Sequence, residues 1–227
     1  MVLVPGWRLN QTVTVNAVGM NAYGDRLQSS TVPATDTWTF CAWIKLADTA
    51  GSRPFSIEDG TGVYHSISIV GASGTDLFID TNLGTSTVLR TLSVGTWYFV
   101  ALSATHTASF PTMNLYVRAQ GEGSLTNTFT DGVAALTPSF AAIGGGPSFN
   151  STPNGSICQY RLWDRVLNST ELLAESRSAT VVSSTNLLSF YKLESAATVL
   201  TATNGATLTN PGGAGTWTTD TSGPTLT

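Results

Sequence analysis

Charged side chains are scarce in this sequence, because its 227 residues include only 10 Lys and Arg and 14 Asp and Glu. The net charge of −4 argues against nucleic-acid binding, which needs clustered Lys and Arg to displace counterions. Long apolar runs are also missing, and no stretch approaches the roughly 20 residues of a membrane-spanning helix. We therefore expect neither a nucleic-acid partner nor a membrane span.

Cysteine and histidine are equally rare, with two residues of each type. Cys41 and Cys158 are too few for a disulfide framework and form no Cys-x-x-Cys metal pattern. A bond between them stays open, but Cys158 alternates in step with Tyr160, which favours an inward position away from Cys41. His65 and His106 lack the spacing of zinc ligands, so we expect no structural zinc site.

Serine and threonine are abundant and make up roughly a quarter of the chain, well above ordinary usage. Thr favours strands, whereas Ser, Gly and Asn favour turns. The segment TWTFCAWIKL (37–46) alternates between two faces: its apolar stripe includes Phe40 and Ile44, and the opposite face carries Trp43. Many such short segments separated by turn signals predict an all-β protein. The others are Pro54–Glu58, Tyr64–Val70, Leu77–Asp80, Val88–Leu92, Trp97–Ser103, Met113–Arg118, Ser139–Ile143 and Leu187–Leu193.

One short helix is expected after Leu167. Asn168 can cap its start and Glu171 follows three residues later, which is the spacing of a capping box. The triplet Trp163-Asp164-Arg165 precedes this helix, where the strand ends. We expect Trp163 to pack at the junction, and Asp164 and Arg165 to hold the corner through local polar contacts.

Five segments, in this order, resemble the laminin-G-like and pentraxin-like domains of the concanavalin A-like lectin/glucanase superfamily. They are WTFCAWIKLAD (38–48), VGTWYFVALS (94–103), MNLYVRAQGE (113–122), AAIGGGP (141–147) and NGSICQYRLWDRVLNSTEL (154–172). The resemblance implies a jelly-roll β-sandwich of two antiparallel sheets with one short helix. It says little about function, because this fold carries lectins, adhesion modules, hydrolases and scaffolds.

We expect a single domain, with residues 1–36 forming an N-terminal arm and opening strands, and residues 37–227 forming the jelly roll. The segment NLLSFYKLES (186–195) resembles the segment that commonly opens such domains, yet it lies near the C-terminus. We therefore expect residues 186–227 to supply closing strands. A permuted arrangement and a cut through a tandem array both remain open.

Catalysis by a glycosidase of this superfamily would need two carboxylates close together. Glu58 and Asp59 are adjacent, so on a strand they would point to opposite faces. Asp76 and Asp80 would share a face if residues 76–80 form one strand, but both are typical of solvated strand ends. No Ser-His-Asp arrangement is evident either, so we expect no catalytic residues and no enzyme.

Calcium is the one cofactor left open, and it needs about six to eight oxygen ligands. Resemblance to the pentraxins implies one acidic ligand at the turn Glu58-Asp59-Gly60, and others from the loop that corresponds to Gly144–Asn154. That loop contains no acidic residue. A calcium site would therefore depend on Asp59 and carbonyl oxygens alone.

Carbohydrate recognition commonly combines an aromatic ring with polar groups that fix the orientation of the sugar. The candidate aromatic residues are Trp43, Tyr64 and Phe149, with Asp59 as a polar partner of Tyr64. Trp43 would face either solvent or a covering loop, because it lies opposite the apolar stripe. The alternative for each ring is that it fills a loop or packs beneath a neighbour.

Three functions remain, of which the first is a non-catalytic module that binds a glycan or cell-surface polymer. The second is a structural subunit, such as a virion decoration or appendage protein, whose apolar arm MVLVPGW (1–7) docks on another subunit. The N-terminus also lacks the charged and apolar regions of a signal peptide. A glycan-degrading enzyme comes third. We expect an extracellular or virion-surface location.

Overall fold

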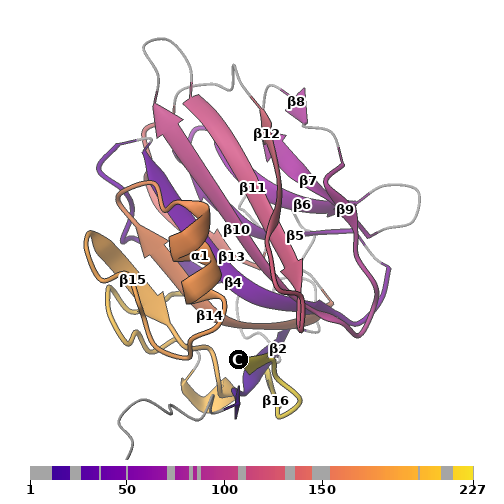
Figure 1. Cartoon of the computed structure of the whole chain (residues 1–227). Helices are drawn as coiled ribbons and strands as arrows, with labels where there is room; N and C mark the ends of the chain where they lie inside the picture. The colour runs from indigo at the N-terminus through magenta and orange to yellow at the C-terminus, as the bar shows by residue number, and fades with distance from the viewer. Residues whose placement is uncertain are drawn as a thin grey trace, which may run out of the picture.

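Two antiparallel sheets pack face to face in the computed structural model (Figure 1). The structure describes residues 12–20, 27–35, 37–49, 51–70, 75–81, 84–85, 88–106, 111–130, 136–144, 154–198, 200–210 and 217–226. One sheet has eight strands in the order β12-β11-β10-β4-β14-β2-β16, with β15 also paired to β14. The other has seven strands in the order β3-β13-β5-β6-β7-β8, with β9 paired to β7. The predicted jelly-roll sandwich is confirmed.

The strand bounds are as follows. The eight-stranded sheet contains β2 (Ala17–Met20), β4 (Trp38–Leu46), β10 (Trp97–His106), β11 (Pro111–Ala119), β12 (Thr126–Thr130), β14 (Gly155–Trp163), β15 (Leu187–Tyr191) and β16 (Thr218–Asp220). The seven-stranded sheet contains β3 (Leu27–Ser29), β5 (Ser52–Glu58), β6 (Tyr64–Val70), β7 (Asp76–Thr81), β8 (Gly84–Thr85), β9 (Arg90–Thr91) and β13 (Phe140–Ile143). The remaining elements are the ladder of β1 (Val13–Thr14) with β17 (Thr225–Leu226), the helix α1 (Ser169–Glu175) and the 3-10 turn η1 (Ala196–Thr198).

The main core lies between the two sheets, and the alternation of β4 builds its part of it as predicted. Phe40 and Ile44 on β4 belong to this core together with Phe55 and Ile67 from the seven-stranded sheet. The Phe40 ring stacks on Trp38 at 5.5 Å between ring centroids. Burial of each such side chain contributes roughly 1.5–3 kcal/mol to stability, so this core holds the sheets together.

A second core covers the outer face of the eight-stranded sheet. Trp43, Phe99 and Trp163 extend from the strands, and Leu167 and Leu172 cover them from α1 and the segment before it. Figure 1 shows α1 in front of this sheet, over β4, β10 and β14. Both faces of β4 are therefore buried, which explains why the face opposite its apolar stripe contains few polar residues.

A β-bulge in β14 changes the predicted position of Cys158. Its register with β4 shifts between Cys158 and Arg161, and Gln159 has a φ of 57°. The extra residue reverses the alternation, so Cys158 joins the second core while Tyr160 faces the main core. The predicted inward position of Cys158 is therefore wrong. Cys158 and Cys41 lie in the same cluster as buried free thiols.

Segments from both ends of the chain complete the eight-stranded sheet. From the C-terminal part, β15 pairs with β14, and β16 pairs with β2. From the N-terminal part, β2 lies between β14 and β16. The described parts of residues 1–36 and 186–227 thus contribute strands to one sandwich, although the boundary at residue 37 stays a prediction. In the parts of the chain listed above, no helix has the length and hydropathy to cross a membrane.

Candidate ligand site at the β5–β6 hairpin

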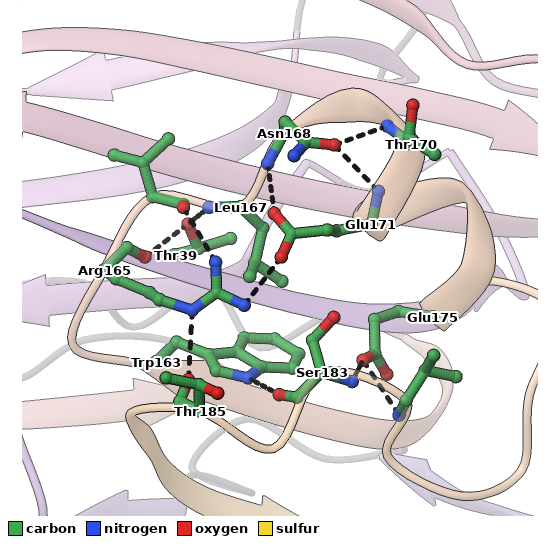
Figure 2. Close-up of polar contacts among 12 residues, drawn as sticks. Thr39, Trp163, Arg165, Leu167, Asn168, Thr170, Glu171, Glu175, Ser183 and Thr185 are labelled. Atoms are coloured by element: carbon green, nitrogen blue, oxygen red, sulfur yellow. Dashed lines mark hydrogen bonds and ion pairs between the residues drawn. The ribbon is translucent and has the colours of Figure 1, made fainter.

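The triplet Trp163-Asp164-Arg165 is a corner of the scaffold, as predicted. The Trp163 side chain is completely buried, and its indole nitrogen donates a hydrogen bond to the Ser183 carbonyl at 2.6 Å (Figure 2). The Asp164 carboxylate accepts a hydrogen bond from the Ala34 backbone N–H at 3.1 Å. Trp163 therefore packs beneath the chain that follows α1 and has no surface to offer to a ligand.

Arg165 and the capping box fix the start of α1 (Figure 2). The Arg165 guanidinium donates to the Thr185 carbonyl at 3.0 Å and to the Glu171 carboxylate at 2.7 Å. The Asn168 side-chain oxygen accepts from the backbone N–H groups of Thr170 and Glu171, at 3.0 Å each. The Glu171 carboxylate accepts from the Asn168 N–H at 2.9 Å, which completes the predicted capping box.

A buried ion pair fixes the other end of α1. The Arg161 guanidinium donates to the carboxylate and the backbone carbonyl of Glu175, both at 2.8 Å. It also donates to the Gln159 side chain at 2.9 Å and to the Ser178 carbonyl at 2.6 Å. The two charged side chains are 1% and 0% exposed, so this network holds the fold and is closed to ligands.

The turn between β5 and β6 is closed by the Asp59 carboxylate. It accepts hydrogen bonds from the Thr61 backbone N–H and hydroxyl at 2.7 Å each. It also accepts from the N–H groups of Gly62 at 3.2 Å and Val63 at 3.1 Å. Gly60 and Gly62 have φ angles of 80° and 113°, which residues with a side chain rarely adopt. The sequence Asp-Gly-Thr-Gly therefore forms a tight turn with a carboxylate at its centre.

These hydrogen bonds keep Asp59 charged. Partial desolvation raises the pKa of Asp59, but the hydrogen bonds from Thr61, Val63 and Gly62 outweigh it and hold the pKa below its ordinary value. The carboxylate oxygens are thus directed at the turn's own N–H and O–H groups. Among the described residues, no three His, Cys, Asp or Glu side chains are arranged to hold a metal ion. In the described residues, Asp59 is therefore not joined by a cluster of acidic calcium ligands, and residues 145–153 of the loop Gly144–Asn154 lie outside the described residues.

Next to this turn, a polar cluster lies on the outer face of the seven-stranded sheet. The Arg53 guanidinium lies 4.8 Å from the centroid of the Tyr64 ring and forms an ion pair with the Asp80 carboxylate. The Tyr64 hydroxyl donates to Asp80 at a long 3.4 Å. The Ser68 hydroxyl donates to Asp80 at 2.9 Å and accepts from Arg53 at 3.0 Å. Three adjacent strands thus hold a ring, a guanidinium and a carboxylate in one fixed arrangement.

Small side chains form the floor beside this cluster. Ser56, Ser66 and Asp80 are register partners on β5, β6 and β7. The Ser56 hydroxyl donates to the Glu58 carboxylate at 2.6 Å, and the Ser66 hydroxyl donates to the Asp80 carbonyl at 3.0 Å. The serines are buried, whereas Tyr64 is half-buried and rises beside them. This part of the outer face is therefore polar beside the half-buried Tyr64 ring, and the same face also carries the half-buried Phe78 opposite Ser68 and the buried Phe140 opposite Glu58.

The phenol of Tyr64 acts as a donor at neutral pH. Burial raises the pKa of Tyr64, and the negative charge of Asp80 raises it further. The Arg53 and Asp80 side chains are 13% and 10% exposed, so a part of each still reaches solvent. The arrangement presents the half-buried Tyr64 ring next to the partly exposed Arg53–Asp80 pair, in which Nε and Nη2 of Arg53 donate to Ser68, Tyr64 and Asp80 and Nη1 is buried.

The predicted site residues lie in different environments in the structure. The hairpin brings Tyr64 and Asp59 together, because hydrogen bonds join Asp59 to Val63, the neighbour of Tyr64. Trp43 is 1% exposed in the second core, with the Arg118 guanidinium 5.8 Å from its ring centroid. Its ring cannot stack on a ligand because α1 and the following chain cover that face, so Trp43 leaves the candidate site. Phe149 lies outside the described residues.

Sequence reasoning missed Arg53, which lies just before the predicted strand Pro54–Glu58, and a second bulge hides the face on which it lies. Arg53 and Phe55 have the same parity, so simple alternation would place both in the main core. The register with β6 shifts between Ser52 and Phe55, and this shift turns Arg53 to the outer face. Asp80 was noted for sharing a face with Asp76, and the strand β7 does contain both. Its partner Arg53 could not be inferred from that pattern.

A family model described as the concanavalin A-like lectin/glucanases superfamily matches residues 21–173, which is more than half of the chain. The chain belongs to this superfamily. A comparison with curated protein sequences gave no match. The superfamily assignment agrees with the two packed sheets and with the five segments that resemble laminin-G-like and pentraxin-like domains.

Three solved structures resemble this chain. The heptameric SAP-like pentraxin of Limulus polyphemus is 17% identical, with a TM-score of 0.50, over 74% of this chain and 84% of that one. A putative carbohydrate binding protein of Bacteroides ovatus is 18% identical, with a TM-score of 0.59, over 81% of this chain and 52% of that one. The LG1-3 region of the laminin alpha2 chain is 11% identical, with a TM-score of 0.51, over 70% of this chain and 33% of that one. At these identities the likeness shows the fold alone, and the chain spans about half of the second protein and a third of the third.

Proposed function

We propose that this chain is a non-catalytic carbohydrate-binding module whose site lies at the β5–β6 hairpin. The observation that supports it best is the fixed cluster of Tyr64, Arg53 and Asp80 beside the Asp59 turn. Sugar sites combine an aromatic ring with a few polar groups that are already in place before the ligand arrives. Here the ion pair and Ser68 hold the polar groups, so little side-chain entropy would be lost on binding.

Each member of the cluster would have a separate part in binding. Arg53 covers one face of the Tyr64 ring. The C–H groups of a sugar would therefore contact the part of the ring that Arg53 does not cover. Nη2 of Arg53, whose hydrogen bond to the Tyr64 hydroxyl is a long 3.4 Å, would donate to one sugar hydroxyl, and the Asp80 carboxylate would accept from its neighbour. Such a pair of groups matches the adjacent hydroxyls of a sugar ring, in which each oxygen both donates and accepts.

The state of the carboxylates supports a binding role rather than catalysis. A glycosidase needs one carboxyl group with a raised pKa as an acid and a second as a base or nucleophile. The pKa of Asp59 is lowered, and Asp80 is paired with Arg53. Glu58 is buried and accepts from Ser56. We therefore propose binding without turnover, at an extracellular location where glycans are displayed.

A glycan array probed with the purified chain, with calcium and with EDTA, tests this function. We expect binding to at least one glycan at the same strength under both conditions, because the Asp59 oxygens are taken by the turn. Binding that disappears in EDTA would contradict the metal-free site. Absence of binding under both conditions would reject the proposal and favour the structural-subunit alternative, whose arm (residues 1–7) lies outside the described residues.

A further inference from the structure

Most of the basic residues in the described part of the chain are neutralised by ion pairs. Of its 10 Lys and Arg residues, Arg8 and Arg26 lie outside the described residues, which leaves eight. Five of these eight form ion pairs, which removes them as free partners for an anionic ligand. The pairs are Lys45–Asp220, Arg53–Asp80, Arg90–Glu122, Arg161–Glu175 and Arg165–Glu171.

The other three basic residues belong to the eight-stranded sheet and its cover. Arg118 on β11 is 3% exposed and donates to the Ser176 hydroxyl at 2.8 Å. Arg177 lies two residues after the end of α1, and Lys192 directly follows β15. The candidate site lies on the outer face of the other sheet, so these residues add no positive charge to its strands.

The strands of the site carry an excess of negative charge. Residues 52–81, which include β5, β6 and β7, contain one basic residue, Arg53. The same range contains four acidic residues. These are Glu58, Asp59, Asp76 and Asp80. Arg53 is already paired with Asp80, and the Asp59 carboxylate stands at the turn next to Tyr64.

We infer that this site takes uncharged glycans and discriminates against glycans that carry carboxylate or sulfate groups, an inference that rests on the proposed function. An anionic sugar would have to draw Arg53 away from Asp80, whose side chain is only 10% exposed and would lose its counterion. It would also approach the charged Asp59 turn. A neutral sugar meets neither obstacle, because its hydroxyls can bond to the ion pair without separating it.

A matched pair of ligands tests the inference: a neutral oligosaccharide selected on the array, and the same oligosaccharide carrying sulfate or carboxylate groups. We expect the acidic form to bind at least about tenfold more weakly, because like charges placed together are strongly unfavourable. The affinity for the neutral form should change little between about 50 and about 500 mM salt, because no ligand charge is screened. Equal or tighter binding of the acidic form would overturn the inference but not the proposed function. Failure of both forms to bind would reject the proposed function itself.

Two variants locate the source of the discrimination. Asp59→Asn removes the charge but keeps a side-chain oxygen for the N–H groups of the turn. It should lower the ratio of the affinity for the neutral form to the affinity for the acidic form by at least about threefold. Asp48→Asn makes the same change in net charge in the chain after β4, where Asp48 accepts from Asn154 at 2.6 Å. It should leave the ratio unchanged. An unchanged ratio in Asp59→Asn, or equal narrowing in both variants, would contradict discrimination at the hairpin.

Discussion

Replacing Arg161 by Leu is expected to lower the free energy of unfolding by about 3–5 kcal/mol, the range for breaking a buried ion pair from one side. Arg161 is 1% exposed and is the counterion of Glu175, which is fully buried. The variant would leave the Glu175 carboxylate charged in the interior without its partner. It would also remove the donors to Gln159 and Ser178, which join α1 and the chain after it to the bulge in β14.

Two further variants show whether the loss of stability is specific to the buried ion pair. Chemical denaturation measures the free energy of unfolding of all three variants. Arg165→Leu breaks the more exposed pair with Glu171, whose side chains are 23% and 27% exposed, and should lower stability by at most about 1 kcal/mol. The double variant Arg161→Leu/Glu175→Leu should recover much of the loss of the single variant, because no unpaired charge remains. A loss below about 1 kcal/mol in Arg161→Leu would show that the buried pair does not hold α1 on the sheet.

Replacing Tyr64 by Ala is expected to weaken glycan binding by about a hundredfold, or roughly 2–3 kcal/mol, the effect of truncating a central aromatic contact. The variant removes the ring that Arg53 packs on and the hydroxyl that donates to Asp80. Tyr64→Phe keeps the ring and loses the 3.4 Å hydrogen bond, so it should lose only about fivefold. Calorimetric titration with an array-selected oligosaccharide measures both losses.

A matched tyrosine on the opposite sheet is the control for this prediction. Tyr116 on β11 is half-buried like Tyr64, but it packs against the second core. Tyr116→Ala should leave the affinity within about twofold of the unchanged protein, because its ring lies on the outer face of the other sheet. Thermal unfolding of both variants must show that each is folded at the temperature of the titration. A folded Tyr64→Ala protein with undiminished affinity would place the site elsewhere.

The central strands were predictable because their alternation is strong. β4 carries a regular apolar stripe, and Phe40 and Ile44 lie in the main core as predicted, while β10 contains the predicted strand Trp97–Ser103. β12 was missed because its sequence TNTFT has no apolar stripe and it lies at the end of the strand order. Its strand character depends on pairing with β11, a contact that the local sequence does not encode. Short strands such as β2 and β16 depend on partners in the same way.

Two bulges mark where alternation fails. The shift at Gln159 moved Cys158 from the predicted inner face to the second core, and the shift after Ser52 turned Arg53 outward. A bulge adds one residue to a strand, so every parity assignment across it is reversed. The capping box at Asn168 was predictable because its partners lie within four residues of one another. Local patterns therefore predicted local geometry and failed where the register changed.

The candidate site was predictable only in its local part. Asp59 and Tyr64 belong to one hairpin, so sequence proximity already placed them together. The cover over Trp43 comes from α1, far along the chain, and period-2 alternation cannot distinguish solvent from such a cover. The link between Arg53 and Asp80 crosses three strands and depends on a bulge. The hydrogen bonds that complete the cluster therefore had to be read from the structure.

Amide chemical shifts measured during titration with a neutral oligosaccharide test the central claim most directly, because they report where the ligand binds. We expect the perturbed amides to cluster at Arg53, Asp80 and the turn from Asp59 to Tyr64, on the outer face of the seven-stranded sheet. The amides of α1 and of the corner at Trp163 should not shift. Perturbations confined to α1 and the eight-stranded sheet, with the β5–β6 hairpin unchanged, would contradict the account.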